Sequence, residues 1–201
     1  IMDMRHLTTP VGAPELAMIS NAVAQLAGYY NLPSFVAGGL ADSIVPDAQA
    51  ALEKTLTALM AAQGGANVIY GAGMIEMGMT FDLAQLIIDS EIYKMVLHTI
   101  NGFEVNEETL ALDVIKEVKM GEFVSQKHTT DNFKKIQSHS EIINRQPREQ
   151  WLAAGGRDMT EVAYERAIQI IENHKPEPLT EEQAAYIRKV VEDAEAEYGV
   201  R

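Results

Sequence analysis

The chain has 201 residues and is 47% hydrophobic, which is enough to form the buried core of one domain with a helical appendage. Its formal net charge of −13 argues against nucleic acid as a partner, because binding phosphates requires clustered Lys and Arg. Cysteine is absent, which excludes disulfides and thiolate metal sites, and no apolar run is long enough to cross a membrane. We therefore expect a cytoplasmic protein.

Three short apolar segments with strand character recur about 33 residues apart, and each precedes a helical pattern. The strand segments are residues 1–6, 34–39 and 67–73, and the helical patterns are residues 14–30, 47–63 and 80–100. Because the chain begins inside a strand-like segment, we expect it to be part of a longer one.

Apolar residues lie at helical spacing along one face of each of these helical patterns. The faces are formed by Leu16, Ile19, Val23 and Leu26, by Leu52, Leu56 and Leu59, and by Leu83, Ile87 and Ile92. Gly64, Gly65 and Gly102 are typical of helix ends.

This alternation predicts an α/β fold made of three βα units with a parallel sheet. The strand segments are apolar throughout, as expected for strands that are covered on both faces. A doubly wound sheet and a (β/α)8 barrel both fit this pattern. Three units cannot close a barrel, since a complete one typically needs about 250 residues.

The character of the sequence changes near residue 103, because most of the charged residues follow it. We expect residues 1–103 to form the βα units and residues 104–201 to form a helical extension that packs on them. In the extension we predict an amphipathic helix at 106–120, a loop-rich stretch at 121–147, and helices at 160–173 and 180–198. Thr180 and Gln183 have the spacing of a capping box.

Functional groups of parallel βα folds gather where the strands end, which here selects Arg5, the loop around Gly38 and Gly39, and residues 70–76. Neither glycine loop matches a phosphate-binding fingerprint. Arg5 is suited either to clamping a carboxylate or to a salt bridge at the rim of the sheet. Both interpretations of Arg5 stay open.

Acidic and aromatic residues near the other two strand ends are candidates for binding a cation. Glu76 either supplies negative charge to a cationic substrate or belongs to the first turn of the next helix, whereas we expect Asp42 to cap a helix. Tyr70 and Phe81 either face a quaternary ammonium group or belong to the core.

The histidines lack the spacing of a metal site. We expect His128 to lie in a loop after a helix, where it is a candidate for lining the mouth of the fold or is simply a loop residue.

Several strings of the sequence, in this order, resemble the C-terminal part of the trimethylamine and glycine betaine methyltransferase family. They are residues 1–5 (IMDMR), 13–17 (APELA), 32–39 (LPSFVAGG), 42–43 (DS), 46–50 (PDAQA) and 67–76 (NVIYGAGMIE), then His128-Thr129 before Phe133 and Trp151 before Gly155. The resemblance covers most of the chain. It is more specific for the family than for any one substrate.

The resemblance implies a (β/α)8 barrel of roughly twice this length, in which the three βα units are the closing ones. It also implies transfer of an N-methyl group to cob(I)alamin, carried by a separate corrinoid protein, with no cofactor held tightly by this chain. Members that act on trimethylamine contain pyrrolysine at a position that we place at or near Leu40. A leucine there points to the branch that acts on quaternary amines such as betaines. We expect Arg5 to hold the carboxylate and Glu76 the ammonium of such a substrate, in a site that includes Tyr70, Gly38, Gly39, Leu40 and His128.

Two other interpretations remain. The first is a fragment without activity that serves as a packing or interaction module, because an incomplete barrel leaves strand edges unpaired. The second is another barrel enzyme such as an aldolase or lyase, which needs a lysine or a metal site at a strand end, and the sequence places no lysine on one. We also expect the protein to form a homo-oligomer.

Overall fold

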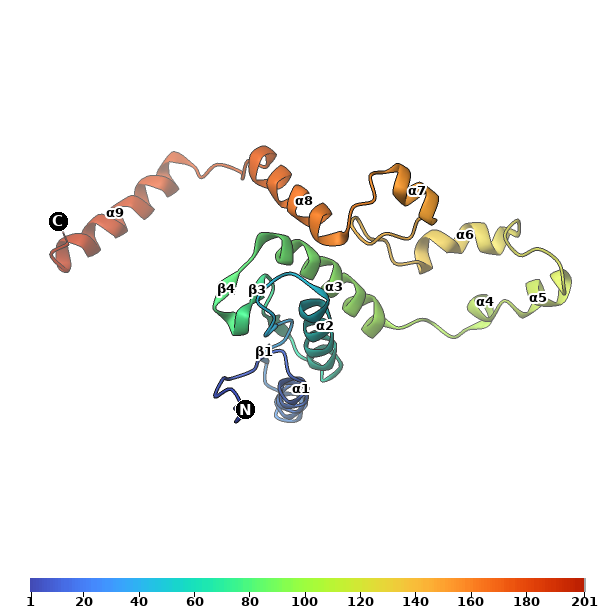
Figure 1. The fold of residues 1–201 in the computed structure, drawn as a ribbon, viewed down its shortest axis with the longest axis horizontal. Coiled ribbons are helices and arrows are strands. Elements are labelled where there is room, and N and C mark those ends of the chain that lie inside the picture. The colour runs from blue at the N-terminus through green and yellow to red at the C-terminus, as the bar shows by residue number, and fades with distance from the viewer. Residues whose placement is uncertain (201) are drawn as a thin grey trace. The chain divides into compact units, whose positions relative to one another are not determined.

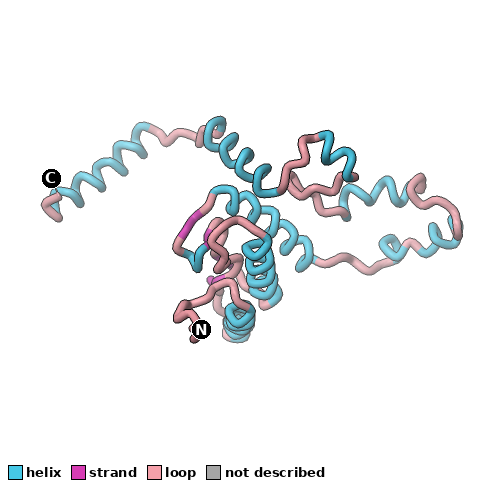
Figure 2. The backbone as a smooth tube through the Cα atoms, viewed as in Figure 1, coloured by secondary structure: helices cyan, strands magenta, loops and turns pink. Residues whose placement is uncertain are grey.

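The structure is a computed structural model that describes residues 1–200 (Figure 1). It divides into two compact units, residues 1–168 and the segment from Gln169 onward. Helices dominate the trace, and the strands are short (Figure 2). The elements are α1 (Pro14–Tyr29), β1 (Phe35–Ala37), α2 (Ala48–Gln63), β2 (Val68–Tyr70), β3 (Met74–Ile75), η1 (Glu76–Gly78), β4 (Thr80–Phe81), α3 (Leu83–Asn101), α4 (Glu107–Leu110), α5 (Leu112–Val118), α6 (Lys127–Ile136), α7 (Arg148–Ala153), α8 (Met159–Asn173) and α9 (Glu181–Glu197).

Strands β1 and β2 lie side by side and parallel, which confirms the second and third predicted strands. Val36 pairs with Ile69 in this register, and both side chains pack toward the helices against Ala24 and Ala61. Side chains alternate between the two faces of a strand, so the neighbouring residues point the other way. Phe35, Val68 and Tyr70 are accordingly exposed. The sheet is therefore covered on one face only, whereas its apolar sequence predicted cover on both.

Helix α2 packs between α1 and α3. The residues of α1 and α2 that are buried are mostly small, with Ala17, Ser20 and Ala24 on α1 and Ala50, Thr57, Ala58 and Ala61 on α2. Small side chains let neighbouring helices approach closely. The larger apolar residues of the predicted faces, such as Ile19, Leu26 and Leu52, are exposed. Helical spacing thus located these two helices correctly but did not identify the face that packs.

The first predicted strand, residues 1–6, was wrong. Residues 3 and 8 instead form a single antiparallel bridge, and Leu7 between them has a φ of 57°. The carboxylate of Asp3 accepts hydrogen bonds from the backbone N–H of Arg5 at 2.8 Å and from its guanidinium group, and it contacts His6 at 3.0 Å. These local bonds close a tight turn where the sequence predicted an extended segment.

No closed barrel is present in residues 1–200. The described strands form two separate two-stranded sheets, β1 with β2 and β3 with β4. The structure therefore contains a β1–α2–β2 unit of the expected kind. A complete barrel remains a prediction about a longer polypeptide.

Strand β4 of the β3–β4 hairpin occupies the first two residues of the helix that the sequence predicted at 80–100. Helix α3 begins at Leu83, because the side chain of Asp82 accepts a hydrogen bond from Gln85 N at 2.7 Å and so caps the helix. The expected helix at 80–100 therefore started about three residues too early.

The part of the first unit that follows α3 differs from the sequence prediction in two places. The expected helix at 106–120 is broken into α4 and α5 at Ala111, whose φ is 49°. The stretch at 121–147 contains helix α6 and is not only loop. Ala163 of α8 and Ile142 join Ile88 and Ile92 of α3 in one apolar cluster, so residues beyond 103 do pack on α3. A domain boundary at residue 103 stays a prediction.

The segment from Gln169 onward contains α9, whose beginning is as predicted. Thr180 and Gln183 form the expected capping box, with each side chain bonded to the other residue's backbone N–H. Among residues 1–200, none of the helices combines the length and apolar character that crossing a membrane requires.

Candidate functional site

Two loops meet where β1 and β2 end. The first loop is residues 38–43 and the second loop is residues 71–78. Glu76 N donates to Ser43 O at 2.7 Å, and Met77 N donates to Ala41 O at 3.0 Å. Parallel pairing of β1 with β2 puts both loops at the same edge of the sheet. The structure therefore brings together two of the three strand ends from which the sequence predicted a site.

Gly71 makes this close contact between the loops possible. Its φ is 145°, and a Cβ atom built on it would lie 2.8 Å from Leu40 Cγ and 3.0 Å from Gly39 C, and would overlap the Gly38 carbonyl oxygen. Leu40 is itself buried, at 5% exposure. The side chain at the candidate pyrrolysine position is therefore packed against the second loop.

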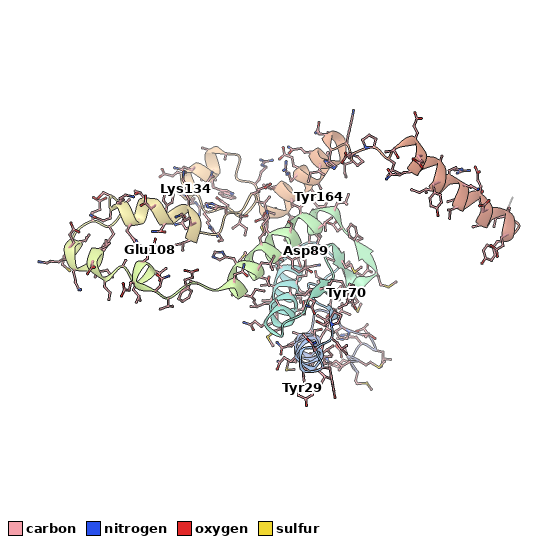
Figure 3. The ribbon with its side chains drawn as sticks, turned by 180° about the vertical axis from the view of Figure 1, so that it is seen from behind. Tyr29, Tyr70, Asp89, Glu108, Lys134 and Tyr164 are labelled. Atoms are coloured by element: carbon pink, nitrogen blue, oxygen red, sulfur yellow. The ribbon has the colours of Figure 1, made fainter. Side chains whose placement is uncertain are left out.

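A buried ion pair lies directly beneath both loops. Lys54 of α2 is fully buried, and its ammonium group donates to Gly39 O at 2.7 Å, to Gly71 O at 3.1 Å and to Asp89 Oδ2 at 2.7 Å. Figure 3 labels Asp89, which lies in α3, and Tyr70, which is the last residue of β2. Every N–H of the ammonium group has an acceptor.

Both oxygens of the Asp89 carboxylate also accept hydrogen bonds from neighbouring groups. Oδ2 accepts from Gly73 N at 2.6 Å, and Oδ1 accepts from Gln85 Nε2 at 2.8 Å. Gly39 N donates to the hydroxyl of Thr57 at 2.9 Å. Side chains of α2 and α3 thus hold the backbone of both loops.

Burial governs the ionisation of this network. It lowers the pKa of Lys54 and raises the pKa of Asp89, and the attraction between the two charges opposes both shifts. Burial, together with the charge of Asp89, raises the pKa of Tyr93 to about 12. The hydroxyl of Tyr93 donates to Gly38 O at 3.3 Å, so it too contacts the first loop.

Glu76 and Asp42 lie within the two loops. Glu76 has a φ of 53°, and its carboxylate accepts a hydrogen bond from the Thr80 hydroxyl. Asp42 accepts from Val11 N at 2.6 Å and Gly12 N at 3.0 Å, just before α1 begins. Helix α2 is capped by a different residue, Asp47. The predicted capping role of Asp42 is therefore replaced by a tie between the first loop and residues 11–12.

Tyr70 lies at the end of β2 on the exposed face of the sheet. Its ring stacks on Phe35, with the ring centroids 4.8 Å apart and the planes at 12°. Phe81 instead lies against Gly73. The aromatic surface on the exposed face of the sheet is therefore made by Tyr70 with Phe35, a partner that the sequence did not suggest.

The structure does not join Arg5 or His128 to the two loops by a hydrogen bond within residues 1–200. The guanidinium group of Arg5 bonds to Asp3, and its side chain is 84% exposed. His128 belongs to α6 and not to a loop, and its Nε2 lies 2.8 Å from Glu108 O. Their roles in a site stay predictions.

Sequence reasoning missed Lys54 and Asp89 because it looked for functional groups only at strand ends. The sequence nevertheless contained a signal for a buried charge on α2. Lys54 lies on the same helical face as Ala50, Ala58 and Ala61, and a charged residue in a stripe of small apolar residues indicates a buried pair. Across residues 1–200 there is no cluster of acidic residues and histidines suited to a metal ion.

Comparisons with known proteins place this geometry in context. The family model described as trimethylamine methyltransferase matches residues 1–199. The chain is 55% identical over 201 residues to a trimethylamine methyltransferase of Desulfitobacterium hafniense, covering 100% of this chain and 40% of that protein. It is 45% identical over 178 residues to a trimethylamine methyltransferase of Methanosarcina thermophila, covering 88% of this chain and 37% of that protein.

A further relative is named for a different activity. The chain is 34% identical over 201 residues to a glycine betaine methyltransferase of Desulfitobacterium hafniense, covering 99% of this chain and 42% of that protein. The chain thus spans about two fifths of the length of these relatives.

Proposed function

The chain belongs to the trimethylamine methyltransferase family, and from this we propose that the complete polypeptide moves a methyl group from a methylated amine to the Co(I) corrinoid of a partner protein. The observation that carries the proposal is family membership along the whole chain. The meeting of two strand-end loops at one edge of the sheet supports it, because active sites of parallel βα folds lie at that edge.

The reaction requires orientation more than acid–base chemistry. The electron pair of Co(I) forms the new Co–CH₃ bond, the N–CH₃ bond breaks, and its electron pair stays on the nitrogen of the departing amine. A quaternary ammonium substrate leaves as a neutral tertiary amine, so no proton must be delivered. Aligning the N–CH₃ axis with cobalt contributes up to about 7–11 kcal/mol. The corrinoid is a co-substrate in this proposal, and no residue of this chain is assigned to hold it.

The residues at the edge of the sheet have the chemistry to bind the amine. The stacked ring of Tyr70 offers a π face, and Glu76 offers negative charge within the second loop. Arg5 remains our candidate for the carboxylate of a betaine. Gly38, Gly39 and Leu40 supply the wall of the first loop, and His128 remains a candidate for the pocket.

Two observations point to different amines. Leu40 at the candidate pyrrolysine position favours a quaternary amine such as a betaine, as proposed from the sequence. The identity of 55% with a trimethylamine methyltransferase, against 34% with a glycine betaine methyltransferase, favours trimethylamine. We retain the quaternary amine as the finer proposal, because a residue at the candidate pyrrolysine position would bear directly on the chemistry.

The test is a methyl-transfer assay of the complete polypeptide with cob(I)alamin, comparing trimethylamine, glycine betaine and other betaines. Formation of methylcobalamin is followed by its absorbance. We expect turnover with at least one methylated amine, and a lower kcat/KM for Glu76→Gln. Turnover with trimethylamine alone would remove the quaternary-amine proposal, and no turnover with any member of the panel would remove methyl transfer.

A second candidate function is a packing or interaction module without activity. The observation that favours it is the exposed apolar sheet face formed by Phe35, Val68 and Tyr70. Such a face tends to associate with another surface. Light scattering of the wild-type chain and of Phe35→Ser tests this candidate, which predicts an association that the substitution weakens. We also propose that the complete protein is cytoplasmic and forms a homo-oligomer.

A further inference from the structure

Lys54 is the largest fully buried side chain among the described residues. Moving an ion pair out of water is costly, and apolar residues of similar volume in its place are often neutral or stabilising. Stability alone therefore does not explain an ammonium group in the small-residue face of α2. Its contacts suggest what else it does.

The ion pair contacts the backbone of both loops at glycines. Lys54 bonds to the carbonyl oxygens of Gly39 and Gly71, and Asp89 bonds to the N–H of Gly73. A glycine has no side chain through which a loop can be anchored, so only backbone hydrogen bonds hold it at these points. One ion pair therefore fixes three points on two loops that are separated in the chain by α2 and β2.

The two side chains come from rigid elements. Lys54 is in the middle of α2, and Asp89 lies within α3, where Gln85 one turn earlier bonds to its second oxygen. Groups held on helices are placed more accurately than groups held on loops. The positions of α2 and α3 therefore determine, through these hydrogen bonds, where the two loops lie at the edge of the sheet.

We propose that Lys54 and Asp89 are positioning residues that hold the first and second loops in the geometry required to bind and orient the methylated amine. This inference rests on the proposed function. Neither residue touches the amine, since both are buried beneath the loops. They act through Gly39, Gly71 and Gly73, whose backbone carries Leu40 and Glu76. A displacement of about 1 Å at such a site reduces the rate by about 10²-fold.

The experiment compares two variants of the complete polypeptide. Lys54→Met alone leaves the carboxylate of Asp89 buried without its partner, so we expect a large loss of thermal stability. Lys54→Met with Asp89→Leu removes both charges and keeps the volume, so we expect the melting temperature to return close to that of the wild type. If this double variant does not fold, Lys54→Met with Asp89→Asn keeps an acceptor for Gly73 N–H and takes its place.

Two readouts separate positioning from packing. In the folded double variant we expect kcat to fall about 10²-fold with a smaller change in KM, because the amine is bound but misaligned. We also expect faster hydrogen–deuterium exchange in residues 38–43 and 71–78, with unchanged exchange in the interiors of α2 and α3. The matched control is Lys116→Met with Asp113→Leu, which removes an exposed ion pair and leaves both readouts unchanged.

Wild-type kcat and wild-type loop exchange in the folded double variant would overturn the inference. A fall in kcat without faster loop exchange would overturn it too. If the wild-type polypeptide transfers no methyl group from any amine, the proposed function fails, and the exchange measurement still decides whether the ion pair holds the loops.

Discussion

Replacing Gly71 with alanine tests whether the two loops need a glycine at their point of contact. Its φ of 145° lies in a region that side-chain-bearing residues rarely adopt, which costs about 1–3 kcal/mol. The added Cβ would also lie 2.8 Å from Leu40 Cγ and overlap the Gly38 carbonyl oxygen, and overpacking of this kind costs about 1–3 kcal/mol. We expect Gly71→Ala to lower the free energy of unfolding by about 2–6 kcal/mol. This is a large part of the total free energy of unfolding of a typical protein, which is about 5–15 kcal/mol.

Two other glycines separate the contributions of strain and overlap. Gly65 has a φ of 86° but open space around its Cβ position, so Gly65→Ala carries only the strain, about 1–3 kcal/mol. Gly28 lies inside α1 with no neighbour within 4 Å, so Gly28→Ala raises stability by up to about 1 kcal/mol through helix propensity.

The assay is urea unfolding of the complete polypeptide, followed by circular dichroism. The midpoints of the variants are compared where the dependence of the unfolding free energy on urea concentration is unchanged. We expect midpoints in the order Gly28→Ala, wild type, Gly65→Ala and Gly71→Ala, from highest to lowest. Equal midpoints for Gly65→Ala and Gly71→Ala would refute the close contact of the two loops.

Three further predictions concern a helix cap, a buried hydroxyl and a stacked ring. Hydrogen bonds from Ala50 N and then Ser43 lower the pKa of Asp47, so its stabilising effect is present above the unfolded value of 3.8 and is lost as the pH falls through the folded value. Asp47→Ala should cost about 1 kcal/mol at neutral pH and flatten that acid dependence, whereas unchanged urea midpoints at pH 7 would contradict the cap. The pKa of Tyr93 is raised from 10.0 to about 12, so its buried neutral hydroxyl stabilises the fold below pH 10, and this stabilisation is lost as the pH rises towards 12. Tyr93→Phe should remove the tyrosine ionisation that occurs at the highest pH in an ultraviolet titration. A variant that keeps this ionisation step would contradict its assignment to Tyr93. Tyr70→Leu removes a π face from the edge of the sheet and should raise the KM for a quaternary amine with little change in melting temperature, so a wild-type KM would exclude that face from the site.

The sequence alone determined helices α1, α2 and α9 and the parallel strand pair. Helical spacing, capping residues and glycine stops are local properties, and they located α1, α2 and α9 to within about two residues. The three βα repeats also pointed to the edge where β1 and β2 end, and the structure brings Gly38, Gly39, Leu40, Tyr70 and Glu76 to that edge.

Only the tertiary structure decided which faces pack and which charged residues are buried. Leu52 and Ala58 are equally compatible with an amphipathic helix, and it is the close approach of α1, α2 and α3 that buries the alanine and exposes the leucine. Residues 1–6 look extended by composition, but the hydrogen bonds of Asp3 close a turn there. Lys54 and Asp89 are 35 positions apart, and no local pattern relates them. Their pairing depends on the packing of α2 against α3, because a charge is buried only where folding brings its partner within hydrogen-bonding distance.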